Sequence, residues 1–227
     1  MKLIPLLLLT GMLAVSGWAE DFKLEPYSPE LVKKAEAGHA VDQYNLGQCH
    51  EKGFGVIRDN KEAVKWYTKS AEQGYATAAF ALSRCYEDGK GVLRDKNEAK
   101  KWFIKGVESG DENELLRILD PIYQGDGREG AEKRFFLYRR LAELGNAKAQ
   151  YEYGVNCMLG EGVTKDEKEA LIWYMKASEQ GNVKAQRDLG RYYANHEDVK
   201  EAVKWYTKAA EQGNAQAKKE LERLKSK

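Results

Sequence analysis

Histidines are the first residues of this chain to consider for catalysis or metal binding. The three, His39, His50 and His196, lie far apart in the sequence, and none has a second ligand at helical spacing such as the H-E-x-x-H pattern supplies. Nor does a G-x-S-x-G motif hold a nucleophilic serine on a sharp turn. His50 takes the place of Tyr86 in an internal repeat, so we expect it in the core, with His39 and His196 in exposed loops. We predict no catalytic residue, no metal and no cofactor.

Cysteines are the next candidates, because they could form disulfides. Cys49 and Cys85 occupy the same position of two repeats that lie 36 residues apart, and Cys157 lies two repeats further along. Packed helices lie about 8–10 Å apart, whereas a disulfide needs Cα atoms within about 7 Å of each other. We therefore expect three buried thiols that pack as small apolar residues.

Acidic residues are numerous enough to supply a carboxylate pair of the kind used in glycoside hydrolysis. Four aspartates, however, are each followed three residues later by a glutamate, the spacing of a capping box that satisfies free N–H groups at a helix start. The pairs are Asp59/Glu62, Asp95/Glu98, Asp166/Glu169 and Asp198/Glu201. Capping explains them better than acid–base chemistry, and Lys65, Lys69 and Glu72 are predicted to form the solvated face of one of these helices.

The elements that hold these residues come from the internal repeat. Residues 46–74 align without a gap on residues 82–110, and the same frame returns at residues 153–181 and, with a shorter turn, at residues 189–213. Each copy ends in a glycine, which readily adopts the left-handed conformation that closes a helix. Together with Gly38 and Gly145, which continue the same spacing, these glycines are Gly74, Gly110, Gly181 and Gly213. The pattern predicts an all-α stack of two-helix hairpins, each burying its apolar face against the next.

Each hairpin is predicted to consist of a helix A, a turn and a helix B. In helix B, apolar residues such as Ala63, Trp66 and Tyr67 fall on one face at helical spacing. A glycine in the middle of helix A costs about 1 kcal/mol in propensity, which indicates that it permits close contact between helices. These glycines are Gly47, Gly154 and Gly190.

The pattern A-x-x-x-L-G-x-x-Y-x-x-G-x-G-V…D-x-x-x-A-x-x-W-Y-x-K-A-A-x-Q-G resembles that of Sel1-like repeats, relatives of the tetratricopeptide repeat. The resemblance covers residues 29–227 and implies a right-handed α-solenoid that serves as an adaptor, commonly in exported bacterial proteins. We predict repeats at residues 40–75, 76–111, 112–146, 147–182 and 183–214, with half-repeat caps at 29–39 and 215–227.

Two repeats depart from the pattern. The third has Leu137 in place of the usual Trp, Pro121 inside its helix A and no capping aspartate. Because proline removes a backbone donor and tends to kink a helix, we expect the array to bend between the second and fourth repeats. The fifth repeat has a shortened turn at residues 194–197.

The first residues predict export. A lysine precedes an apolar run at residues 3–15, and small residues then lead to a signal-peptidase site after Ala19. The run is shorter than the roughly 20 residues that cross a bilayer, so we expect cleavage and no integral membrane insertion. Residues 1–19 would be removed, residues 20–28 would be flexible, and the protein would act in the periplasm or outside the cell.

The charge balance bears on the partner. The chain has 37 basic and 36 acidic residues, and losing Lys2 with the signal peptide makes the two counts equal. Basic and acidic residues interleave along every segment, which disfavours nucleic acid as a partner. We expect a monomer that binds a protein or peptide.

Helix A surfaces line the inner wall of such a solenoid, and this wall is the predicted binding surface. By register, the candidate partner-binding residues are Tyr44, Gln48, Phe80, Arg84, Tyr151, Val155, Arg187 and Arg191. Aromatic and arginine side chains often anchor interfaces. The alternative is that Tyr44, Phe80 and Tyr151, which share one repeat position, pack between neighbouring helices.

Two rival functions stay open beside a non-enzymatic adaptor with a regulatory, envelope-assembly or host-contact role. Some secreted, cysteine-rich Sel1-type proteins are described as penicillin-binding or β-lactamase-like, but they carry a cysteine pair in each repeat. Here no helix B contains a cysteine, so this resemblance is weak. The same wall could instead bind envelope glycan.

Overall fold

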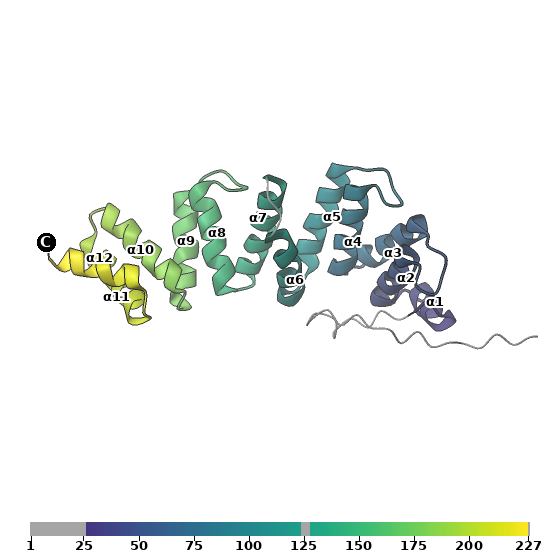
Figure 1. Cartoon of the computed structure of the whole chain (residues 1–227), viewed down its shortest axis with the longest axis horizontal. Coiled ribbons are helices and arrows are strands. Elements are labelled where there is room, and N and C mark those ends of the chain that lie inside the picture. Colours follow the sequence, from purple (N-terminus) through teal and green to yellow (C-terminus); the bar gives the residue numbers. More distant parts are fainter. Residues whose placement is uncertain (1–25, 124–127, 227) are drawn as a thin grey trace, which may run out of the picture.

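The computed structural model describes residues 26–123 and 128–226, with the side chains of residues 120–129 excepted. These residues form twelve α-helices and no strand, and the helices follow one another in an elongated row (Figure 1). Between the end helices α1 (Pro29–Glu36) and α12 (Ala215–Lys225), A and B helices alternate. The A helices are α2 (Ala40–Lys52), α4 (Ala76–Asp88), α6 (Glu112–Tyr123), α8 (Ala147–Leu159) and α10 (Val183–Asn195). The B helices are α3 (Asn60–Glu72), α5 (Lys96–Ser109), α7 (Arg128–Glu143), α9 (Glu167–Glu179) and α11 (Val199–Glu211).

The predicted all-α solenoid is therefore confirmed. The predicted signal peptide, residues 1–19, lies outside the described residues. Of the predicted flexible segment, residues 26–28 are described and are fixed to the array: Tyr27 N–H donates to the Phe54 carbonyl at 3.2 Å, and Ser28 caps α1. Among the described helices, none is long and apolar enough to cross a membrane.

Each predicted aspartate caps its helix B. Asp59 Oδ1 accepts from the Glu62 N–H at 3.1 Å, and Asp95, Asp166 and Asp198 accept in the same way. The second bond of the predicted capping box, from the Asp59 N–H to the Glu62 carboxylate, does not form, so this part of the prediction is wrong. The Asp59 N–H donates to the His50 carbonyl at 2.9 Å, and the Glu62 carboxylate pairs with Lys65 at 2.7 Å instead.

The terminal glycines close their helices as predicted, with one exception. Five of the six have φ between +86° and +98°. Gly110 is extended, with φ −71° and ψ 144°, so the left-handed conformation predicted there is wrong. A Cβ atom on Gly110 would lie 2.9 Å from Leu115, which shows why the residue is still small.

Buried glutamines join the first, fourth and fifth repeats to the helix B that precedes each of them. The Gln43 amide donates to the Ala35 carbonyl at 3.1 Å, and its oxygen accepts from Gln73 at 2.6 Å. Gln150 with Gln180, and Gln186 with Gln212, repeat this arrangement. The second repeat has Ala79 and Ser109 at these positions, and it is also the repeat whose final glycine is extended.

Glycines in helix A bring the two helices of a hairpin together, as predicted. A Cβ atom on Gly47 would lie 2.7 Å from the ring of Tyr67. Gly154 faces Tyr174, and Gly190 faces Tyr206, in the same way. In the second repeat, Ser83 replaces the helix A glycine, and the close contact moves to Gly106 in helix B. The hairpins therefore depend on a small residue where an aromatic ring crosses.

The outward face of helix B is solvated, as predicted for Lys65, Lys69 and Glu72. It also shields the tryptophans, because Lys69 Nζ lies 4.0 Å from the centre of the Trp66 ring. Lys105 over Trp102, Lys176 over Trp173 and Lys208 over Trp205 repeat this cation–π contact.

The third repeat packs differently from the others. Pro121 lies within α6, Leu137 is buried where other repeats have Trp, and α6 contacts α7 less extensively than the helices of other hairpins contact each other. The N-terminus of α6 carries a complete capping box, since Glu114 N donates to Asp111 at 2.9 Å and Asp111 N to Glu114 at 3.3 Å. The start of α7 borders residues 124–127, which lie outside the described part, and the predicted bend stays a prediction.

All three cysteines are buried thiols, as predicted, and none forms a disulfide. Burial raises the pKa of Cys85 to about 11 and also raises the pKa of Cys49 and Cys157. The thiols therefore stay protonated at neutral pH.

The predictions for the histidines are confirmed in part. His39 and His196 are exposed at helix ends, as predicted. His50 is only half-buried, as is Tyr86 at the same position of the second repeat, so the expected place in the core is wrong; its ring lies edge-on to that of Tyr27 at 6.0 Å between centroids.

Candidate functional site

The three aromatic candidates lie in the core. Tyr44, Phe80 and Tyr151 are only 5–8% exposed. Each ring centroid lies 5.6 Å from that of an aromatic ring in helix B of the same repeat; these partners are Tyr67, Phe103 and Tyr174. Packing therefore explains all three side chains. Two of them also reach the next A helix, because the Tyr44 ring centroid lies 5.4 Å from that of Tyr75 at the start of α4 and the Tyr151 hydroxyl donates to Asp188 in α10.

The remaining five candidates keep surface that a partner can reach. Arg84 and Arg191 are exposed, while Gln48, Val155 and Arg187 are half-buried. We call the surface formed by α2, α4, α8, α10 and α12 the A-helix wall.

Asp188 in α10 organises the C-terminal part of this wall. Its carboxylate is 5% exposed and accepts from the Tyr151 hydroxyl at 3.0 Å and from Arg187 Nε at 2.9 Å. Arg191 approaches the same carboxylate at 3.6 Å. Burial and the Asp188 charge raise the pKa of Tyr151, so its hydroxyl stays a donor.

A hollow of about 430 Å³ opens between α10 and α12. Arg187, Arg191 and Arg223 line it together with Tyr206 and Glu220. We call it the C-terminal hollow. The sequence prediction missed Arg223 because it treated residues 215–227 only as a cap. The available signal was the repeat register, which places Arg223 at the position of Arg191.

A second hollow, of about 390 Å³, occupies the equivalent place between α2 and α4. Gln48 and Arg84 line this N-terminal hollow together with Glu51, Lys52 and Lys90. The Tyr67 hydroxyl donates a hydrogen bond to the Glu51 carboxylate at 2.6 Å, which holds this carboxylate against the core. Two ammonium groups and a single guanidinium group supply its positive charge.

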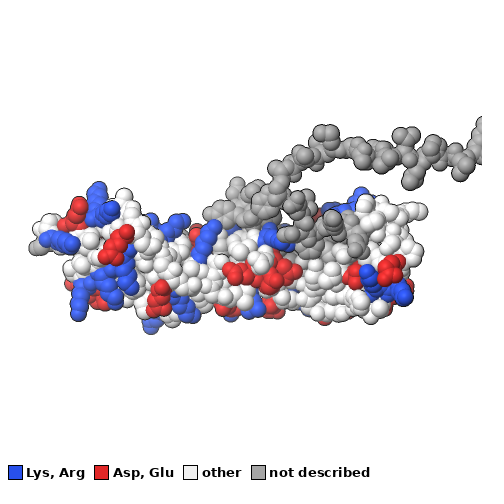
Figure 2. All heavy atoms as spheres, turned by 90° about the horizontal axis from the view of Figure 1, so that it is seen from below, with Lys and Arg blue, Asp and Glu red and all other residues white. Residues whose placement is uncertain are grey.

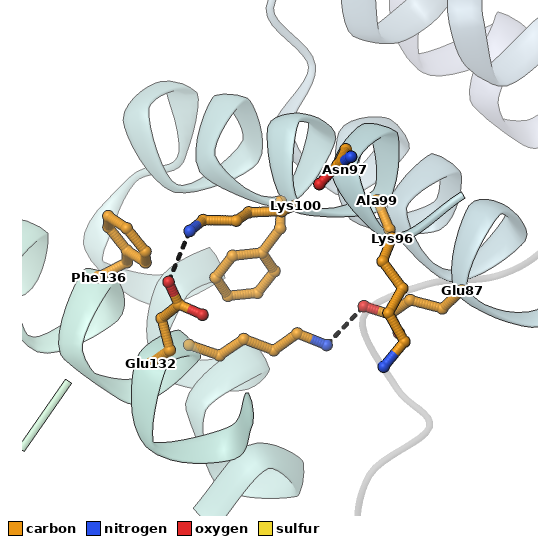
Figure 3. A pocket seen from close by; sticks show the side chains of 9 residues that line it. Glu87, Lys96, Asn97, Ala99, Lys100, Glu132 and Phe136 are labelled. Atoms are coloured by element: carbon orange, nitrogen blue, oxygen red, sulfur yellow. Dashed lines mark hydrogen bonds and ion pairs between the residues drawn. The ribbon is translucent and has the colours of Figure 1, made fainter. Parts of the chain in front are cut away.

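A third hollow, of about 340 Å³, lies between α5 and α7 (Figure 3). Phe103 and Phe136 give it an apolar floor. Two ion pairs cross its rim, Lys100 with Glu132 at 2.6 Å and Lys133 with Glu87 at 2.5 Å. Each of these two lysines thus already has its own carboxylate partner.

The charge pattern of the surface differs along the molecule. On the face shown in Figure 2, acidic side chains gather near the middle, and basic side chains are densest toward the C-terminal end, with acids among them. Within the described residues, no group of three His, Cys, Asp or Glu side chains is placed to hold a metal ion.

Comparisons with known proteins agree with the repeat pattern. The Sel1 repeat family model matches residues 40–75, 76–111, 147–182 and 183–214. A solved Sel1 repeat protein from Oxalobacter formigenes is 34% identical, with 84% of this chain and 80% of that chain covered and a TM-score of 0.44. A protective antigen of uropathogenic Escherichia coli displaying an SLR fold is 29% identical, with 84% and 50% covered and a TM-score of 0.38.

A curated relative is much longer. Chitin synthase regulatory factor 3 of Schizosaccharomyces pombe is 30% identical over 173 residues, which are 70% of this chain but span only 18% of that protein.

Proposed function

This chain belongs to the Sel1 repeat family, and from that premise we propose that it is a non-enzymatic adaptor that binds a protein or peptide partner through the A-helix wall. Repeat folds of this kind are generally interaction scaffolds, because stacked repeats create an extended surface whose side chains vary without loss of the core. The main support for this proposal is the C-terminal hollow. Its arginines Arg187 and Arg191 occupy the positions that hold an aromatic and an amide side chain in the first repeat.

Export is part of the proposal. The apolar run at residues 3–15 and the cleavage site after Ala19 support action in the periplasm or outside the cell. A regulatory, envelope-assembly or host-contact role is compatible with such a protein, and we propose that it acts as a monomer.

Affinity capture with matched variants tests this proposal. The tagged chain is recovered from its native compartment as wild type, as an Arg191→Gln, Arg223→Gln double variant, and as Lys65→Gln, a control on the exposed outward face of helix B. We expect one protein to co-purify with wild type and Lys65→Gln and to be lost with the double variant, because arginines anchor interfaces. Equal recovery by all three forms would remove the C-terminal hollow from consideration.

The rival functions are tested on the same purified chain. Hydrolysis of nitrocefin above background would support a β-lactamase-like enzyme, and co-sedimentation with isolated peptidoglycan would support a glycan binder. We expect neither.

A further inference from the structure

We propose that the C-terminal hollow binds a single carboxylate group of a peptide partner, held by Arg187, Arg191 and Arg223. The inference rests on the proposed adaptor function and adds the chemical group that the partner must offer. It comes from three observations: the number of guanidinium groups, the charge they leave unmatched, and the buried carboxylate that fixes one of them.

The guanidinium groups that line the hollow come from two neighbouring helices of the A-helix wall, α10 and α12. Arg187 and Arg191 come from α10, and Arg223 comes from α12. A guanidinium group offers five N–H donors in a fork that matches both oxygens of a carboxylate. Amide groups of Asn195 and Gln216 complete the polar rim.

The charges of this site do not balance. Arg187 and Arg191 share the carboxylate of Asp188, at 2.9 and 3.6 Å, and Arg223 pairs with Glu220 at 3.0 Å. Three guanidinium groups thus face two carboxylates, which leaves one positive charge unmatched. A carboxylate monoanion neutralises that charge, whereas a phosphate dianion would overcompensate it.

The site is partly organised before any ligand arrives. Asp188 is buried and also accepts the Tyr151 hydroxyl, so Arg187 is held in place. Arg191 and Arg223 have side chains that are 67% and 62% exposed, and they can turn toward a ligand. A fixed group reduces the entropy cost of binding, and exposed arginines supply bidentate contacts.

The N-terminal hollow supplies an internal control. It lies between equivalent helices but contains one guanidinium group, Arg84, with the ammonium groups of Lys52 and Lys90. Lys90 is already paired with Asp88 at 2.6 Å. An ammonium group acts as a point charge without the fork geometry of a guanidinium group, so we expect no selective carboxylate binding there.

Nuclear magnetic resonance of the arginine Nε–H groups tests the proposal with simple probes. N-acetylglycine carries the carboxylate of a peptide C-terminus, N-acetylglutamic acid α-amide carries a side-chain carboxylate, and N-acetylglycinamide carries none. We expect saturable shifts of the Arg191 and Arg223 signals with at least one carboxylate probe and none with the amide. The tighter of the two carboxylate probes identifies whether the partner offers its C-terminus or an acidic side chain.

Matched variants complete the test. Arg223→Gln should weaken carboxylate binding by about tenfold, because one charge-assisted contact is lost, while Lys65→Gln, on the outward face of helix B, should leave it unchanged. Circular dichroism confirms that each variant is folded, and Arg223 and Lys65 are both exposed, so neither change removes core packing.

Three results would overturn the carboxylate site: no saturable shift with either acid, equal weakening by both variants, or tighter saturation by inorganic phosphate than by N-acetylglycine. None of them would overturn the adaptor function, which depends on partner capture. Loss of capture in the double variant together with an absence of carboxylate binding would show that the wall binds a partner of different chemistry.

Discussion

The two ends of the A-helix wall share one backbone pattern and differ in chemistry. Tyr44 in α2 corresponds to Arg187 in α10, and Gln48 corresponds to Arg191. At the N-terminal end the tyrosine packs into its own hairpin, whereas at the C-terminal end the arginine requires a carboxylate, Asp188, next to it. The repeat therefore sets the position of a wall residue, whereas the side chain at that position and its charged neighbours determine whether it packs in the core, as Tyr44 does, or forms an ion pair at the surface, as Arg187 does.

Replacing the central carboxylate should produce the largest difference between the two ends. Asp188→Ala would leave Arg187 without its buried partner and the Tyr151 hydroxyl without its acceptor, at a cost of about 2–4 kcal/mol in the free energy of unfolding. The equivalent residue at the other end is Asn45, and Asn45→Ala should cost less than about 0.5 kcal/mol. Urea unfolding followed by circular dichroism measures both, and equal losses would show that the two ends do not differ in this way.

Replacing a helix A glycine with alanine should lower the free energy of unfolding by a similar amount at the two ends, because the same glycine–tyrosine contact occurs in both hairpins. A Cβ atom would lie 2.7 Å from Tyr67 in Gly47→Ala and 2.6 Å from Tyr206 in Gly190→Ala. Overpacking costs about 1–3 kcal/mol, and better helix propensity returns about 1 kcal/mol, so we expect a net loss of roughly 0–2 kcal/mol for each. A gain in stability in either variant would contradict the close approach.

High pH should weaken the fold through the buried tyrosines of the wall. Burial raises the pKa of Tyr44 to about 12, against about 10 in the unfolded chain, so the unfolded state loses its proton first. Stability should therefore hold up to pH 10 and fall as the pH rises from 10 to 12. Thermal melts across this range, compared between wild type and Tyr44→Phe, measure the effect, and a smaller loss is expected in the variant. An identical pH dependence in the two proteins would count against it.

The smallest effect concerns the thiols at the N-terminal end. Because burial raises the pKa of Cys85 to about 11, a thiol reagent at pH 8 should react slowly with the native protein. After denaturation without reductant, three thiols should be counted. Fewer than three would mean that a disulfide forms.

Local signals explain how much of the fold the sequence predicts. A helix start needs only an aspartate such as Asp59 at the correct place, and a close helix contact needs only a glycine such as Gly47, so the repeat pattern reveals both. The role of Glu62 could not be predicted, because the donor it would have accepted from is taken by a helix A carbonyl. The need for a small residue at Gly110 could not be predicted either, because it comes from Leu115 in the next repeat, 2.9 Å from where a Cβ atom would lie.

The candidate site was less predictable, because it depends on which helices meet. Arg187 and Arg191 follow from the register of one helix, but Asp188 has its role only because Tyr151 comes from the preceding A helix. Arg223 joins them only because α12 stacks on α10. Contacts between repeats, rather than signals within one repeat, assemble the site.

Site-specific photocrosslinking tests the central claim most directly. A photoreactive amino acid is placed at position 191 in the C-terminal hollow, at position 84 in the N-terminal hollow, and at position 65 on the outward face of helix B, and the chain is irradiated in its native compartment. We predict that one partner protein is captured from position 191 and not from position 65, with position 84 weaker than 191. Equal capture from positions 191 and 65 would contradict the assignment of partner binding to the A-helix wall.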